Sequence, residues 1–209
     1  MIAGRRPEAG FTLAEMAIVI VIISILLLGV LKGEALLTSG KVQDVIALAK
    51  DMSIAVADFK QRYHLFPGDL PIDATTPAIP GIRAECVSGG ANVGDGNGVI
   101  SVTESACVPE VLLKIGVGKA NLDSSGWYVF STTYGPARVM AAGVSSVPAL
   151  VRPSVVNVIL FERLPCAVAL EVDRKIDDGN LSTGKSAASV ATCTPGGTND
   201  PVPFFAVAL

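Results

Sequence analysis

Four cysteines are the side chains of this sequence best suited to covalent chemistry: Cys86, Cys107, Cys166 and Cys193. None of them forms a C-x-x-C pair, and His64 is the one histidine, so a zinc site is not expected. An even number of cysteines in a chain that is exported, as the N-terminal segment described below suggests, favours two disulfides. The sequence leaves three connectivities open, with unbridged thiols in a cytosolic protein as the alternative. We favour Cys86–Cys107 and Cys166–Cys193, because each pair is close in sequence and encloses one turn-rich segment.

Two oxygen-rich turns are the places where a hard cation such as calcium could bind. Residues 95–98, DGNG, begin like a calcium loop, but Val99 and Ile100 then interrupt the alternating oxygen ligands. The second turn contains Asp177, Asp178 and Asn180. Aspartate, asparagine and glycine are also good turn formers without any metal. We therefore expect no bound metal, and calcium at the second turn is the alternative.

Patterns typical of enzymes are missing from the sequence. It has no G-x-S-x-G, H-E-x-x-H or P-loop motif. His64 lies near Tyr63 and Phe66 at a predicted helix end, where capping or packing is the expected role. The formal net charge is −3 and no basic cluster occurs, so nucleic-acid binding is not expected. We predict a protein that is not an enzyme, with no catalytic and no cofactor-binding residues.

An apolar segment near the N-terminus accounts for the unusual composition. Half of the residues are apolar and 17% are charged, against about 25% charged in ordinary soluble domains. Glu15 is the only charged residue between Phe11 and Leu31. As a helix this segment spans roughly 32 Å, enough for a bilayer core of about 30 Å. Arg5 and Arg6 precede it and should keep the N-terminus in the cytoplasm, which predicts a single transmembrane helix.

The small residues that could mark a processing site precede the apolar segment. An ordinary secretory signal has its small-residue cleavage site after the apolar run, whereas Lys32 and Glu34 follow this one. Ala9 and Gly10 come directly before it. Cleavage after Gly10 would remove the charged leader and keep the apolar helix.

Residues 10–15, GFTLAE, resemble the type IV prepilin motif, and the apolar helix follows at the position that this family requires. The resemblance implies cleavage between Gly10 and Phe11 by a prepilin peptidase, which also methylates the new N-terminus at Phe11. It further implies an inner-membrane assembly platform and other pilin subunits as partners. A plain signal anchor that keeps Met1 is the alternative.

Glu15 is an acid inside an apolar span, where it costs on the order of 3 kcal/mol near a helix centre and less near an end. After cleavage, the free amine of Phe11 would lie one helical turn away. The resemblance to the pilin family implies that this acid neutralises the N-terminus of the neighbouring subunit during filament assembly. The other reading is that Glu15 stabilises the N-terminus of its own helix, and the two readings are compatible.

The helix is predicted to continue past the membrane. No proline occurs from Phe11 until after Phe66, and beyond Leu31 the apolar residues recur at steps of three and four. They are Val42, Val45, Ala49, Met52, Val56, Phe59 and Tyr63. The helix should end near His64, before a Pro-Gly-Asp turn. The sequence leaves open whether the helix bends at its glycines, each of which lowers helix stability by roughly 1 kcal/mol relative to alanine. They are Gly29, Gly33 and Gly40.

Residues 66–209 are predicted to form an α+β head. We expect a short helix over 103–115 and strands over 127–132, 138–141 and 154–161. Apolar residues four apart predict a second helix, with a strand over the same residues as the competing interpretation; they are Leu164, Val168, Val172 and Ile176. Residues 189–191 and 204–207 should form edge strands. An antiparallel sheet wrapped on the amphipathic helix resembles the pilin head.

The predicted organisation is a leader at 1–10, a transmembrane or filament-core helix at 11–31, an amphipathic helix at 32–65 and the head. The expected function is a structural subunit, pilin or minor pilin, of a type IV pilus-like filament. The alternatives are a pseudopilin of a type II secretion system and a membrane-anchored binding module. The expected location is the inner membrane before assembly and an extracellular or periplasmic filament afterwards.

Overall fold

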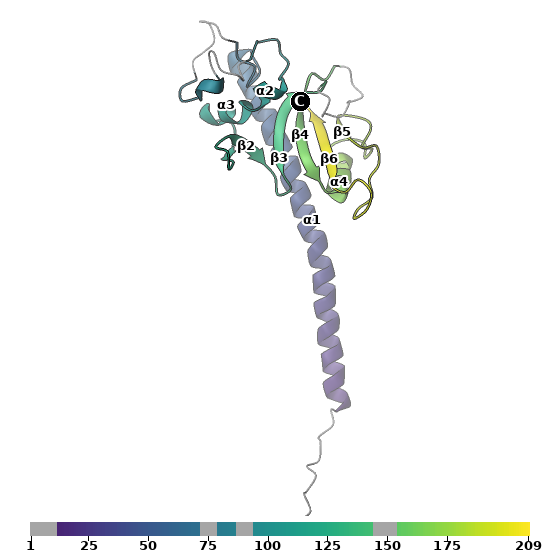
Figure 1. Ribbon diagram of the computed structural model, residues 1–209. Helices are drawn as coiled ribbons and strands as arrows, with labels where there is room; N and C mark the ends of the chain where they lie inside the picture. The colour runs from purple at the N-terminus through teal and green to yellow at the C-terminus, as the bar shows by residue number, and fades with distance from the viewer. Residues whose placement is uncertain (1–11, 72–78, 87–93, 144–153) are drawn as a thin grey trace, which may run out of the picture. The chain divides into compact units, whose positions relative to one another are not determined.

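The computed structural model describes residues 12–71, 79–86, 94–143 and 154–209, without the side chains of 30–38. The predicted processing residues Gly10 and Phe11 lie outside the described residues. The chain, drawn in Figure 1, divides into two compact units, residues 1–40 and 41–209.

Helix α1 (Leu13–Tyr63) contributes to both units. The helical assignment is continuous through Gly29, Gly33 and Gly40. It ends one residue before His64, whose φ of 58° is left-handed and whose side chain is exposed. Among the residues that the structure describes, we find no helix with the length and hydropathy needed to cross a membrane.

The predicted apolar stripe of α1 is confirmed in the second unit. Its first six members are all less than 7% exposed, and Tyr63 is half-buried with its ring centroid 4.5 Å from that of Phe59. They share one hydrophobic core with aromatic residues of the sheet, namely Phe130, Phe161 and Phe205. Figure 1 shows the sheet lying across this part of the helix. The α+β fold class is therefore as predicted.

The described residues form one antiparallel sheet of six strands in the order β1-β2-β3-β4-β6-β5. Its strands are β1 (Asn121–Leu122), β2 (Tyr128–Ser131), β3 (Pro136–Ala141), β4 (Asn157–Leu164), β5 (Ser186–Ala188) and β6 (Val202–Ala208). Strand β4 is central and apolar on both faces. Ile159 and Phe161 join the core with α1, whereas Val158 and Leu160 belong to a second cluster. This alternation follows from the period of two in a strand.

Two predicted strands differ from the structure. Residues 189–191 are not a strand; the strand at this edge of the sheet is β5, whose Ser186 is buried and donates its hydroxyl to Asp173. Residues 204–207 lie in β6, which is an interior strand between β4 and β5. Its partner β4 is distant in sequence, so local composition gave no sign of this pairing.

The helices of the second unit also refine the predictions. The expected helix over 103–115 is split into α2 (Val102–Ser105) and α3 (Val108–Lys114). Pro109 accounts for the break, because its ring would clash with a carbonyl of the preceding helical turn. The predicted second helix is confirmed as α4 (Cys166–Ile176), and the competing strand is wrong. A short 3-10 helix, η1 (Ala84–Cys86), precedes them.

Gly94 offers a test of this packing. A Cβ atom at Gly94 would overlap the backbone of Asp69 and Leu70, neither of which can rotate away. We expect Gly94→Ala to lower the free energy of unfolding by about 2 kcal/mol. Gly143→Ala is the matched control, because a Cβ there meets none of the described residues within 4 Å, and it should change stability by less than about 0.5 kcal/mol. Equal urea midpoints for the two variants would contradict the contact.

Candidate functional site

The N-terminus of α1 is closed by a reciprocal pair of capping interactions. The backbone N–H of Thr12 donates to Oε2 of Glu15 at 2.8 Å, and the Thr12 hydroxyl donates to the same oxygen at 2.9 Å. In return, the backbone N–H of Glu15 donates to Oγ1 of Thr12 at 3.3 Å. This is the geometry of a capping box, in which the first and fourth residues satisfy each other's unpaired backbone groups. Glu15 therefore stabilises its own helix, as one of the two readings predicted.

Half of the Glu15 carboxylate remains available for another contact. Within the described residues, Oε1 accepts no hydrogen bond, and the side chain is exposed. Capping its own helix through Oε2 is thus compatible with binding a cation through Oε1. The sequence signal for the cap was the spacing of Thr12 and Glu15, three residues apart before an apolar run, and our reading of the sequence did not use it.

The helix surface after Glu15 is apolar on every side. All side chains from 12 to 29 are exposed in this unit, including Leu13, Ile18 and Leu26 at 92%, 60% and 63%. The Ser24 hydroxyl donates to the carbonyl of Ile20 at 2.7 Å, so its polar group is satisfied within the helix. A helix that is apolar all round requires lipid or other protein as its surroundings.

The two disulfides of the structure are the pairs that the sequence favoured. Cys86 is bonded to Cys107 with a Cα–Cα distance of 5.6 Å, and Cys166 to Cys193 with a Cα–Cα distance of 5.8 Å. Both distances are usual for disulfides. The two bonds connect different pairs of segments within the second unit.

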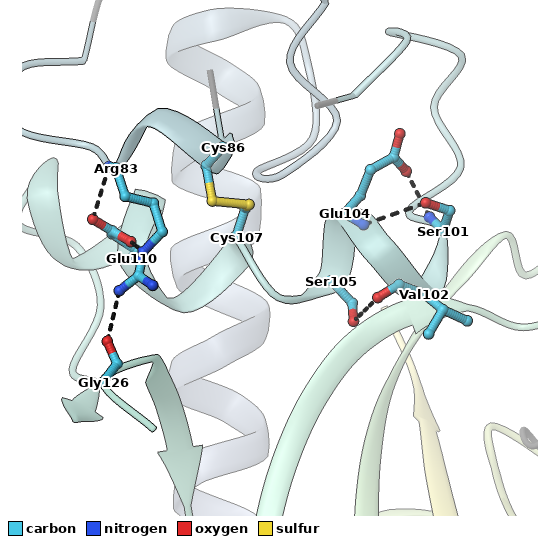
Figure 2. The surroundings of a disulfide bond; sticks show 9 residues. All are labelled: Arg83, Cys86, Ser101, Val102, Glu104, Ser105, Cys107, Glu110 and Gly126. Atoms are coloured by element: carbon cyan, nitrogen blue, oxygen red, sulfur yellow. Dashed lines mark hydrogen bonds and ion pairs between the residues drawn. A yellow bond between two sulfur atoms is a disulfide. The ribbon is translucent and has the colours of Figure 1, made fainter. Parts of the chain in front are cut away.

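The Cys86–Cys107 bond lies beside a charged contact that joins the same segments (Figure 2). Arg83 places its Nε 2.5 Å from Oε2 of Glu110 and donates from Nη2 to the carbonyl of Gly126 at 2.8 Å. Its guanidinium also lies 4.0 Å from the ring centroid of Trp127. Glu110 is 4% exposed, so the ion pair is largely shielded from water. The disulfide therefore fixes η1 to the residue before α3, and the ion pair fixes Arg83 to α3 itself.

The Cys166–Cys193 bond connects the start of α4 to the loop before β6. Asp200 holds the same junction, because it accepts from the backbone N–H of Gly196 at 2.6 Å and of Cys166 at 2.9 Å. These two bonds lower the pKa of Asp200 from its ordinary value. Asp200 was not singled out from the sequence, since its role depends on a helix that starts 34 residues earlier.

The oxygen-rich turn at 95–98 is organised by a buried acid rather than by its own side chains alone. Asp69 is fully buried and accepts from the N–H groups of Gly96 and Gly98 at 2.6 and 2.7 Å. Burial raises the pKa of Asp69, and the two backbone bonds oppose that shift. Both Asp69 oxygens thus have a structural partner. The sequence gave no reason to select Asp69, because its partners lie about 27 residues away.

The second oxygen-rich turn brings together a different set from the one that the sequence suggested. Asp177 and Asp178 gather with Asp173 of α4, and one carboxylate oxygen of each lies within 4.8 Å of the others. Asn180 is instead used inside the turn, where its side-chain oxygen accepts from the N–H and the hydroxyl of Ser182 at 3.1 and 2.9 Å. Asp173 was the residue that sequence reasoning missed, although it lies four positions before Asp177, one helical turn away.

Comparison with known proteins adds information about the N-terminus. A family model described as the prokaryotic N-terminal methylation motif matches residues 5–31, which include Gly10, Phe11 and Glu15. No curated protein and no solved structure matches the chain. The second unit is therefore interpreted from its own geometry.

Proposed function

We propose that this chain, which carries the N-terminal methylation motif at residues 5–31, is a structural subunit of a type IV pilus-like filament. The motif supports a type IV pilin-like or pseudopilin protein, anchored in the membrane and then assembled outside it. The observation that carries the proposal is the start of α1: an apolar surface on all sides that begins with one acid, whose Oε1 is free within the described residues. The motif gives no indication of enzymatic activity.

The proposed assembly uses both ends of the Glu15 carboxylate. Cleavage after Gly10 exposes the amine of Phe11, and Oε2 of Glu15 keeps the helix of its own subunit capped. Oε1 then pairs with the Phe11 amine of a neighbouring subunit. Lateral association of apolar helices gains little in lipid, because the lipid tails are equally apolar. A charge pair supplies the directional contact that sets the register between helices.

The prepilin peptidase is the partner that this assembly requires first. We expect it to cleave between Gly10 and Phe11 and to methylate the amine of Phe11. Protein purified from its own host should then yield a tryptic peptide of residues 11–32 that is heavier by one methyl group. A host strain without the peptidase is the control and should retain the leader. Assembled material that still begins at Met1 would contradict the proposed processing.

The remaining partners are other pilin subunits and an inner-membrane assembly platform. A pilus subunit and a type II secretion pseudopilin share the processing and the helix contacts described above, and they differ in the machine that extends the filament. Deleting the secretin-linked platform or the pilus platform of the host separates the two. The proposal is supported if loss of the pilus platform leaves the processed chain in the membrane and absent from sheared filaments.

A further inference from the structure

We propose that Asn180 is a glycosylation site, which receives an oligosaccharide on its side-chain nitrogen Nδ2 once the second unit has left the cytoplasm. Asn180, Leu181 and Ser182 form the pattern Asn-x-Ser with no proline in the middle, which is the acceptor pattern for N-linked glycans in exported proteins. No other asparagine of the sequence is followed two residues later by serine or threonine. The proposal rests on export of the chain, which the proposed function also requires, and not on the filament that the chain joins.

The turn that contains the acceptor presents it to solvent. It lies in the connection between α4 and β5, outside any helix or strand (Figure 1). Asn180 and Ser182 are both exposed, whereas Leu181 between them is 2% exposed and belongs to the hydrophobic core. The buried leucine anchors the turn and leaves its two polar neighbours outside. A large hydrophilic group on Asn180 would therefore extend into water without displacing a core residue.

The hydrogen bonds of Asn180 engage its oxygen and leave its nitrogen available. Oδ1 accepts from the backbone N–H of Ser182 at 3.1 Å and from the Ser182 hydroxyl at 2.9 Å. Within the described residues, Nδ2 makes no hydrogen bond, so the atom to be modified has no partner to give up. Both donors also point at the oxygen that gains negative charge when the amide loses an Nδ2 proton, and they stabilise that charge.

The sugar must come from a donor outside the chain, for which we take an oligosaccharide carried on a lipid pyrophosphate. Nδ2 attacks the anomeric carbon of this donor, and a C–N bond forms. The C–O bond to the pyrophosphate breaks, and the lipid pyrophosphate leaves with the electron pair. One Nδ2 proton passes to a base of a membrane-bound oligosaccharyltransferase, and nothing is oxidised or reduced. Donor and transferase are both held in a membrane, where the chain itself is anchored before assembly.

The position of the glycan suggests what it does for the folded protein. The turn leads directly into β5, and within the described residues this strand pairs with β6 alone, at the end of the sheet. An end strand offers unpaired backbone groups to which another chain can add. A bulky hydrophilic group beside the start of β5 would hinder such pairing and so keep crowded subunits from joining through their sheets.

The experiment is mass spectrometry of the mature chain, purified from its own host and digested with trypsin. Cleavage after Lys175 and Lys185 releases the peptide of residues 176–185, which contains Asn180. We expect this peptide to carry the added mass of sugar residues, with fragment ions that place the sugar on Asn180. A wild-type chain in which this peptide is entirely bare would overturn the proposal.

Three variants identify the acceptor pattern. Asn180→Gln should lose the modification, because the acceptor amide is gone. Ser182→Ala should lose it as well, although the asparagine remains, because the hydroxyl that the pattern requires is missing. Ser182→Thr restores a hydroxyl and should stay modified, so it shows that a loss in Ser182→Ala does not come from a disturbed turn. Full modification of Ser182→Ala would contradict the proposal.

Asn199→Gln is the matched control, because Asn199 is also an exposed asparagine of the second unit but is followed two residues later by Pro201. This variant should keep the glycan on Asn180. An added mass on peptide 176–185 that survives Asn180→Gln would overturn the proposal, since the sugar would then be attached to a hydroxyl of the same peptide. A chain that is cleaved after Gly10 and carries no glycan would refute this proposal alone, so its failure is distinguishable from failure of the proposed filament function.

Discussion

Replacing Glu15 by leucine is expected to remove the chain from filaments while leaving it inserted in the membrane with its leader cleaved. Leucine suits an apolar segment at least as well as glutamate, so insertion persists. Gly10 is unchanged, so the peptidase still has its small residue. What the variant lacks is the carboxylate that, in the proposed assembly, pairs with the neighbouring amine. A buried pair is most sensitive to the loss of one partner, because the other charge is then stranded in apolar surroundings.

Two further substitutions separate the pairing role of Glu15 from its capping role. Glu15→Gln keeps a side-chain oxygen that can accept from the Thr12 N–H, but it loses the charge. Thr12→Ala keeps the charge and loses the hydroxyl half of the capping box, at a cost of about 1 kcal/mol. The pairing mechanism predicts poor filament incorporation for Glu15→Gln and near-normal incorporation for Thr12→Ala.

The measurement compares mature protein in membranes with protein in sheared filaments, in a strain that lacks the native copy. We expect incorporation of Glu15→Leu to fall at least about tenfold, corresponding to a loss of about 1.4 kcal/mol or more per subunit contact. A strain that also carries the wild-type gene should partly restore incorporation. Normal incorporation of Glu15→Leu would contradict the pairing mechanism and would show that Glu15 only caps its own helix.

Sequence reasoning succeeded for features whose physical cause is local. The apolar stripe from Val42 to Tyr63 is set by the helical period, and α4 by apolar residues four apart, because one buried face is enough to define a helix. Strand β4 was also predicted, since its continuous apolar run fits a strand that is covered on both faces. Close spacing likewise pointed to the disulfide pairs that the structure contains.

Sequence reasoning failed where the role of a residue depends on a partner far along the chain. Residues 204–207 were assigned to an edge, although β6 is enclosed by β4, about 45 residues earlier, and by β5. The roles of Asp69 and Asp173 depend on glycine N–H groups and on the Ser186 hydroxyl, which reach them only after folding. A buried carboxylate cannot be recognised from the sequence, because aspartate and glutamate usually lie on the surface.

Removing the two disulfides should produce the largest loss of stability. In the loop-entropy model, a bond that closes a loop of 21 or 27 residues contributes about 3 kcal/mol, because it restricts the unfolded chain. We therefore expect Cys86→Ala with Cys107→Ala, and Cys166→Ala with Cys193→Ala, each to lower the free energy of unfolding by about 3 kcal/mol. The Arg83–Glu110 ion pair does not offset the first loss, since it acts in the folded state that both forms share.

Urea unfolding of the full chain, followed by circular dichroism, measures these losses, and the single variants test the connectivity. With the pairing of the structure, Cys86→Ala frees the thiol of Cys107, which is buried in the folded protein. An alkylating reagent added in urea without reductant should therefore label Cys107 and leave Cys166 and Cys193 unlabelled. In Cys193→Ala, the same reagent in urea should label Cys166 alone. Peptide mapping without reduction checks the same pairs in the wild type. A Cys107–Cys166 linked peptide would refute the pairing while leaving the export of the chain intact, because any disulfide still requires an oxidising compartment.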